Sequence, residues 1–195
     1  AAVTGQGAFA SNGSLRYLRG VAALFPEPVH VVVRADSVMA SIGDLRGARV
    51  AVGSIESGTR STAIQVLRAH GLDHGDYVKV DALSPDEALQ LLAFGRVDAV
   101  IEVISAPWQQ LVSVAAESPM KLLPLDSDAM QRLVDDIPGL VPLTILQRTY
   151  GAQGSDTPTL AATALLITRS SEPDATVQQV LQHPRCVNCH IPGPE

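Results

Sequence analysis

Aromatic residues and basic clusters are what this 195-residue sequence most lacks. Phe, Trp and Tyr together make up 4% of the chain, so its hydrophobic core is expected to be aliphatic. Fourteen Lys and Arg residues stand against twenty Asp and Glu residues, which gives a net charge of -6. Proteins that bind nucleic acids concentrate basic residues on one face, and this sequence has no such run. The composition therefore argues against a nucleic-acid partner.

Long hydrophobic runs are absent as well. The longest apolar stretch, Ala161–Ile167, is interrupted by Thr163 and is far shorter than the roughly 20 residues that a transmembrane helix needs. We therefore expect no transmembrane segment in this stretch of chain. Residues 1–13 have neither a basic start nor a sustained apolar stretch, so they do not resemble a secretory signal. With 46% hydrophobic residues, the chain can still form one ordinary domain or two small lobes.

Recognisable catalytic motifs are also missing. The histidines His30, His70 and His74 are scattered, no serine lies in a nucleophile elbow, and no Walker or dinucleotide glycine pattern occurs. Paired carboxylates in a catalytic arrangement are not found either. We therefore expect that the protein is not an enzyme and that its lobes bind no cofactor.

What the sequence does contain is a regular alternation of strand and helix patterns. Short β-branched or apolar runs predict strands, and amphipathic stretches with caps and glycine stops predict helices. The expected strands are Leu15–Phe25, Val29–Val33, Arg49–Gly53, Val78–Ala82, Val97–Val103, Met120–Leu125, Leu140–Leu146 and Leu160–Thr168. The expected helices are Thr59–His70, Pro85–Phe94, one that starts at Pro107, Asp126–Ile137 and Glu172–Gln182. This alternation predicts an α/β fold with a parallel-rich sheet covered by helices on both faces.

Ser57, Gly58 and Thr59 form a polar turn between a predicted strand and a predicted helix. Such a turn presents unpaired backbone N–H groups, two hydroxyls and the positive end of a helix dipole, so it suits a carboxylate or phosphate group. Arg60 in the first helical turn strengthens this preference if its guanidinium faces the ligand. The alternative is that Ser57 is only a helix cap and that Arg60 is a solvated side chain.

The next strand-to-helix loop, Ile104–Trp108, contains further candidates. Ligand crevices in open α/β sheets form outside the carboxyl ends of strands, so Ser105 can donate a hydrogen bond to a ligand there. Trp108 is the only tryptophan and is favoured as a packing residue early in the helix. Glu102 lies in an apolar strand, where a buried carboxylate needs a partner or a raised pKa. A ligand amine, Arg34 and water are all candidates for that partner.

Several segments resemble the TAXI subfamily of TRAP-transporter substrate-binding proteins. The resemblance rests on Pro26–Arg34, Asp44–Gly53 and Ser57–Thr59, and further on Gly95–Ala99, Pro107, Tyr150 and Thr159–Thr168. It covers roughly residues 15–182. The resemblance implies a type-II periplasmic-binding fold, in which two α/β lobes joined by two crossing strands enclose a ligand.

The same resemblance implies a domain organisation and a function. Lobe two would be residues 34–154, and lobe one would be residues 1–33 with 155–182, incomplete because the family's first strand and Gly/Thr-rich loop have no counterpart here. The implied function is a periplasmic receptor that captures a small carboxylate-bearing solute, glutamate-like or a dicarboxylate, for a TRAP-type membrane permease. The ligand-binding residues would be Ser57, Gly58, Thr59, Arg60 and Ser105.

Both cysteines of the chain lie in one motif, Cys186-Val187-Asn188-Cys189-His190, which is the c-type haem attachment pattern. Two thioethers at this spacing anchor a porphyrin, and the adjacent His190 is delivered to the iron as its metal ligand. The alternatives are a redox cysteine pair or half of a zinc site. A thioredoxin-like pair needs a βαβ context, and zinc needs a second ligand pair that the chain lacks.

We therefore expect that residues 183–195 are the truncated start of a cytochrome c-like domain and that haem c is attached only in the full-length protein. A haem domain also favours an alternative function. The chain would then be a ligand-sensing or substrate-docking module of a periplasmic c-type haem electron-transfer protein.

Overall fold

The computed structural model describes residues 17–55, 57–81, 84–151 and 153–182. The chain divides into two units: unit 1 comprises Ala1–Leu24 with Leu165–Glu195, and unit 2 comprises Phe25–Ala164. Two long strands, β1 (Leu18–Arg34) and β7 (Thr157–Arg169), contribute residues to both units. The predicted lobe boundaries, after residues 33 and 154, lie near the end of β1 and the start of β7, whereas the units divide within these strands. The assignment of the units to lobes of a binding protein stays a prediction.

The strands form one mixed sheet in the order β3-β2-β4-β1-β7-β6, and β5 pairs with β1. The remaining strands are β2 (Arg49–Ala51), β3 (Val78–Val80), β4 (Ala99–Val103), β5 (Met120–Leu122) and β6 (Leu140–Ile145). β2 is parallel to β3 and to β4, whereas β1 is antiparallel to β4 and β5, and β6 is antiparallel to β7. The predicted parallel-rich sheet was therefore wrong in this respect. The described residues between β6 and β7 form no helix, and strands joined without a crossover helix pair antiparallel.

The helices follow the sequence patterns closely. They are α1 (Gly58–Ala69), α2 (Pro85–Ala93), α3 (Gln109–Glu117), α4 (Ser127–Asp136) and α5 (Asp174–Leu181), with a short 3-10 helix at Ile42–Leu45. Ser57, Ser84 and Asp126 cap α1, α2 and α4 by accepting hydrogen bonds from first-turn amides. Gly71, at φ 77°, follows the end of α1 as predicted. The predicted helix starts and stops are thus confirmed within a residue or two.

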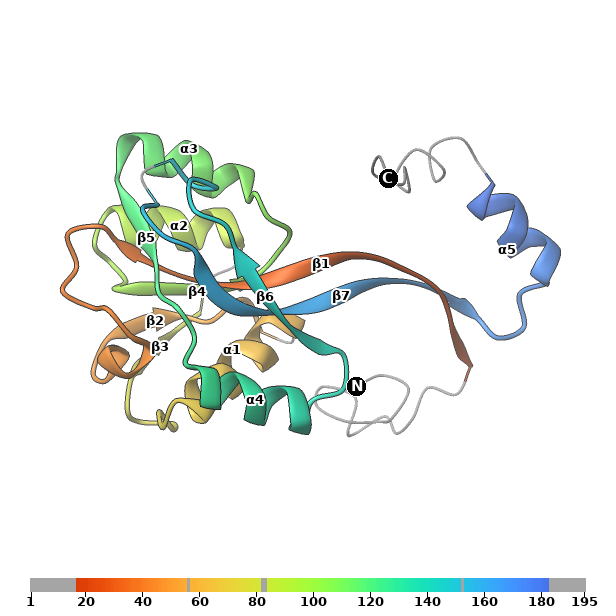
Figure 1. Cartoon of the computed structure of the whole chain (residues 1–195), viewed down its shortest axis with the longest axis horizontal. Helices are drawn as coiled ribbons and strands as arrows, with labels where there is room; N and C mark the ends of the chain where they lie inside the picture. The colour runs from red at the N-terminus through yellow and green to blue at the C-terminus, as the bar shows by residue number, and fades with distance from the viewer. Residues whose placement is uncertain (1–16, 56, 82–83, 152, 183–195) are drawn as a thin grey trace. The chain divides into compact units, whose positions relative to one another are not determined.

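Two hydrophobic clusters pack against opposite faces of the sheet in unit 2. Alternate residues of β1 divide between them, because Val31 and Val33 belong to one cluster and Val32 to the other. One cluster contains buried residues of α1 and α4, and the other contains those of α2 and α3. Figure 1 shows the same arrangement, with α1 and α4 below the sheet and α2 and α3 above it. The expected helical cover on both faces is confirmed.

The first strand differs from its prediction. Leu15–Phe25 and Val29–Val33 were expected as two strands separated by Pro26 and Pro28, but β1 runs through both prolines without a break. The pairing of β1 with β4 begins at Val29, after the prolines, so their missing N–H groups remove no hydrogen bond from that ladder. The prolines therefore do not have to end the strand.

Unit 1, in its described residues 17–24 and 165–182, contains no buried side chain. Arg19 forms an ion pair with Asp174 at 2.7 Å, and the first strand, the end of β7 and α5 line an apolar groove of about 280 Å³. α5 buries none of its residues.

Across the described part of the chain, no helix is both long and apolar enough to cross a membrane.

Candidate functional site

The carboxyl ends of β2 and β4 meet at one edge of the sheet, because these strands are parallel neighbours. The turn after β2 leads into α1, and the loop after β4 leads into α3. We call the residues Val52–Thr59 (without residue 56) and Glu102–Trp108 the carboxyl edge. The paired part of β1 begins at the same edge, where Val29 lies opposite Val103. All of these residues belong to unit 2.

Gly53 shapes the turn that precedes α1. Its φ of +82° lies in the left-handed region, and a Cβ there would come within 2.8 Å of Thr59 Cγ2 and 3.1 Å of Ser57 Oγ. A side chain at this position would therefore displace the residues that open α1. Glycine allows the strand end and the helix start to approach each other closely.

Ser57 caps α1 in the predicted way. Its Oγ accepts a hydrogen bond from the Arg60 amide at 3.0 Å and donates one to the Ser54 carbonyl at 2.8 Å. Its carbonyl accepts the Ser61 amide, which begins the helical ladder. The first N–H groups of a helix have no intrahelical acceptor, and among the described residues none accepts from the amides of Gly58 and Thr59. At the positive end of α1, the amides of Gly58 and Thr59 therefore have no acceptor within the described part of the chain.

Arg60 is not the solvated side chain that one alternative expected, and its contact with a ligand stays a prediction. Its guanidinium donates to Asp81 Oδ1 at 2.5 Å and to the Gly53 carbonyl at 3.4 Å, and its side chain is 16% exposed. It is neither a solvated side chain nor an unpaired cation beside the helix end. The ion pair with Asp81 neutralises the charge that a ligand carboxylate would otherwise meet.

Glu102 is the buried carboxylate of the carboxyl edge. It is 4% exposed, lies one residue before the end of β4 and is the register partner of His30 in β1. Burial raises the pKa of Glu102 to about 7, while hydrogen bonds with the Thr59 side chain and the Val103 backbone act in the opposite direction. Arg34 is not its partner, because Arg34 pairs with Asp36 at 3.3 Å and lies opposite Met120.

His30, Tyr150 and Trp108 form a buried hydrogen-bonded chain beside Glu102's strand. His30 Nδ1 lies 2.9 Å from the Pro28 carbonyl, which can only accept, so Nδ1 carries the proton. His30 Nε2 then accepts from the Tyr150 hydroxyl at 2.6 Å, and the same hydroxyl oxygen accepts the Trp108 amide at 2.9 Å. Burial lowers the pKa of His30 to about 4, so the ring is neutral.

The two other residues of the predicted loop have different surroundings. Ser105 is exposed at the carboxyl edge. Trp108 is 1% exposed at the start of α3, as expected for a packing residue, although its indole Nε1 has no hydrogen-bond partner among the described residues. Of the predicted α1 residues, Thr59 is the one whose side chain acts on Glu102. Sequence reasoning missed the His30–Tyr150 contact, since 120 residues separate its partners.

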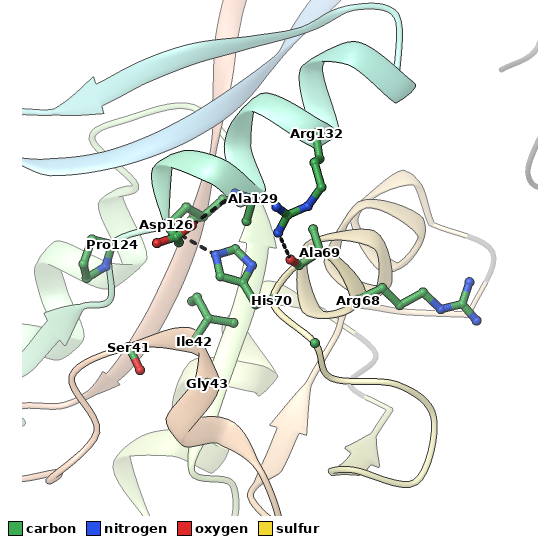
Figure 2. Close-up of a pocket in the computed structure, with 12 residues that line it drawn as sticks. Ser41, Ile42, Gly43, Arg68, Ala69, His70, Pro124, Asp126, Ala129 and Arg132 are labelled. Atoms are coloured by element: carbon green, nitrogen blue, oxygen red, sulfur yellow. Dashed lines mark hydrogen bonds between the residues drawn. The ribbon is translucent and has the colours of Figure 1, made fainter.

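A pocket lies at the other end of α1, away from the carboxyl edge. A pocket of about 710 Å³ is bounded by the end of α1, the 3-10 helix and the start of α4 (Figure 2). His70 Nδ1 donates to the Val66 carbonyl at 2.7 Å, and His70 Nε2 accepts the Asp126 amide at 3.0 Å. Arg132 donates to the Ala69 carbonyl at 2.7 Å. These polar groups already join α1 to α4, so we assign them a structural role.

The predicted haem residues Cys186, Cys189 and His190 lie outside the described residues, and their role stays a prediction. Within residues 17–182, apart from positions 56, 82–83 and 152, no group of three or more metal-binding side chains occurs.

Comparisons with known proteins agree with this architecture. A family model described as the NMT1-like family matches residues 1–183. The periplasmic aliphatic sulphonate binding protein SsuA from Escherichia coli is similar at a TM-score of 0.52 and 20% identity, over 85% of this chain and 46% of that one. A TctC solute binding protein from Polaromonas, solved without ligand, is similar at 0.52 and 14%, over 89% and 59%. A periplasmic binding protein of an ABC transporter from Brucella ovis, with glutathione bound, is similar at 0.50 and 16%, over 89% and 43%.

The chain therefore spans between 43% and 59% of the length of these structures. At identities this low, the likeness shows the fold alone. The expected α/β fold of the type-II periplasmic-binding kind is confirmed.

Proposed function

The chain belongs to the NMT1-like family, and on that premise we propose that it is part of a periplasmic solute-binding receptor. The similar structures are named as binding proteins for small solutes. This supports a receptor that binds its solute without making or breaking covalent bonds. We place it more narrowly in the TAXI subfamily, with a TRAP-type membrane permease as its partner. The segments Pro26–Arg34 and Asp44–Gly53 support that narrower placement.

The proposed solute is small and carries a carboxylate, such as glutamate or a dicarboxylate. The observation that carries this proposal is the start of α1, where the amides of Gly58 and Thr59 have no acceptor among the described residues. An anion at this position gains hydrogen bonds from both amides and the favourable end of the helix dipole. The Ser57 hydroxyl already donates to the Ser54 carbonyl, so the exposed Ser105 is the further donor that we propose for the carboxyl edge. Arg60 contributes by holding the turn through its bonds to Asp81 and Gly53.

Calorimetry on the complete gene product tests the solute class. Glutamate is compared with glutamine and with the α-amide of glutamate, which each replace one carboxylate by a neutral amide. We expect at least one amide to bind about tenfold or more weakly, because hydrogen bonds to a charged group contribute about 1.5–3 kcal/mol. Equal affinities for all three compounds would contradict a carboxylate site at α1.

Two capping serines offer a matched pair for locating the site. Ser57 and Ser84 each accept an amide hydrogen bond from the third residue of their helix, α1 and α2. Ser57→Ala and Ser84→Ala should each lower the free energy of unfolding by about 1 kcal/mol. Only Ser57→Ala should also weaken glutamate binding. Equal losses of binding in both variants would place the solute elsewhere.

The Cys186–His190 motif favours a second candidate, a module of a periplasmic c-type haem electron-transfer protein. Thioether attachment resists acid–acetone extraction, whereas coordinated haem is removed. The complete gene product, exported in cells that mature c-type cytochromes, should stay red after extraction and lose its colour when Cys186 and Cys189 are both replaced by Ala. A colourless exported protein would instead indicate a redox or zinc pair and favour simple transport.

A further inference from the structure

We propose that the protein binds one internal water molecule between the side-chain amide of Gln153 and the outer edge of β5. The site lies within unit 2. It does not depend on the proposed function.

Gln153 organises the loop between β6 and β7. It is 8% exposed, and its backbone carbonyl accepts the Arg148 amide at 3.0 Å. Its side-chain Nε2 lies 3.0 Å from the Ser155 carbonyl and from the Thr157 hydroxyl, and 3.4 Å from the Ile145 carbonyl. Carbonyl oxygens only accept hydrogen bonds, so turning the amide over would place its oxygen against two acceptors. The neighbours of Gln153 therefore fix the orientation of its side chain.

This orientation leaves the oxygen of the amide without a partner. Gln153 Oε1 is buried and accepts no hydrogen bond from the described residues. A buried amide oxygen without a donor has lost the hydrogen bonds that water gives it in the unfolded chain, which costs free energy. Buried polar groups are therefore nearly always paired, either with protein groups or with ordered water.

A small cavity adjoins this side chain. Its volume is about 10 Å³, and its walls include Val32, Leu111, Leu122 and Gln153. A single water needs roughly 10–15 Å³ of such space, so the cavity has room for one water and for no organic solute. A bound water also needs at least two polar partners, and Gln153 Oε1 is the first of them.

The outer edge of β5 supplies the second partner. Leu123 donates its amide to the Val31 carbonyl at 2.8 Å. The next pair of this ladder is Leu122 opposite Val32. Hydrogen-bonded and non-hydrogen-bonded pairs alternate between antiparallel strands, so the N–H and C=O of Leu122 point away from β1. Among the described strands, β5 pairs with β1 alone. A water in the cavity therefore donates to Gln153 Oε1 and accepts from the Leu122 amide, which ties the loop to β5.

A crystal structure of the complete gene product, at a resolution that shows ordered water, tests the inference. We expect one peak at about 2.7–3.2 Å from Gln153 Oε1 and within hydrogen-bond distance of the Leu122 amide. In solution, the Leu122 amide proton should show a nuclear Overhauser effect to water with the sign that a long-lived bound water gives. Gln153→Met keeps the length of the side chain and removes its oxygen, so it should lose the peak. Gln131→Met, at an exposed residue of α4, should keep it.

Each outcome decides the inference and leaves the proposed function untouched. A cavity without a peak in the unsubstituted protein, or a protein donor on Gln153 Oε1, overturns the inference. A peak at about 2.3–2.6 Å also overturns it, since that distance indicates a metal cation. A peak that remains in Gln153→Met means that other groups hold the water and that the role assigned to Gln153 is wrong. The crystal structure and the water contacts of the unsubstituted protein decide the question even if Gln153→Met fails to fold.

Discussion

At the scale of single residues, the carboxyl edge depends on glycines with different requirements. Gly53 has a left-handed backbone and touches Thr59, whereas Gly58 has an ordinary backbone and open space where a Cβ would lie. The two positions are five residues apart on the same turn. A substitution at Gly53 therefore tests the backbone conformation of the turn, and a substitution at Gly58 tests the surface of the turn.

Replacing each glycine by Ala tests that separation. Gly53→Ala should lower the free energy of unfolding by about 1–3 kcal/mol, because it combines a strained backbone with a close contact to Thr59. Gly58→Ala should leave it unchanged or raise it by up to about 1 kcal/mol, since Ala restricts the unfolded chain. Urea denaturation measures both. A Gly58→Ala loss as large as that of Gly53→Ala would mean that the helix start is packed more tightly than described.

At the scale of elements, Tyr150 joins segments that are far apart in the chain. Its hydroxyl bonds to His30 of β1 and to the backbone of Trp108 at the start of α3, while Tyr150 itself follows β6. Its ring packs edge-on to His30 with centroids 5.5 Å apart. The hydrogen-bonded chain thus fixes the loop after β4 against the first strand.

Tyr150→Phe keeps the ring and removes the hydroxyl. Buried His30 Nε2 and the Trp108 amide would both lose their partner, so the free energy of unfolding should fall by about 2–4 kcal/mol. Tyr77→Phe is the matched control, because Tyr77 is also largely buried but its hydroxyl makes no hydrogen bond to the described residues. Thermal or urea unfolding gives both values. A similar small loss in the two variants would show that the Tyr150 bonds contribute little.

At the scale of the whole molecule, two buried groups give opposite pH dependences to the stability. The pKa of His30 falls from its usual 6.5 to about 4, so its contribution is complete above pH 6.5 and is lost as the pH falls towards 4. The pKa of Glu102 rises from 4.5 to about 7, so its contribution is complete below pH 4.5 and is lost as the pH rises towards 7. Between these limits the two effects largely cancel.

Glu102→Gln should remove the contribution of Glu102, so that the difference from the unsubstituted protein measures it. Relative to the unsubstituted protein, the free energy of unfolding of the variant should increase steadily from pH 4.5 to pH 7, by about 1–3 kcal/mol in all. Urea denaturation at intervals of half a pH unit measures the difference. A constant difference across this range would mean that Glu102 titrates normally in the folded protein.

Local patterns in the sequence are sufficient to predict the positions of the helices, their caps and the polar turn at the start of α1. These features depend on periodicity and on residues within one or two turns of each other, as Ser57 with Arg60 and Ser84 with Glu87 illustrate. Such local signals are contained in any short window of the sequence. For the same reason, the family resemblance could be read from short segments.

The directions of the strands and the partners of the buried polar groups depend instead on contacts between distant segments. The sheet is mixed because β1 and β7 run against their neighbours, which no local pattern encodes. Arg60 finds Asp81 across 21 residues, and His30 finds Tyr150 across 120. Each of these side chains could form a hydrogen bond with many other groups. Its actual partner depends on which strands become neighbours when the apolar faces of the sheet are buried.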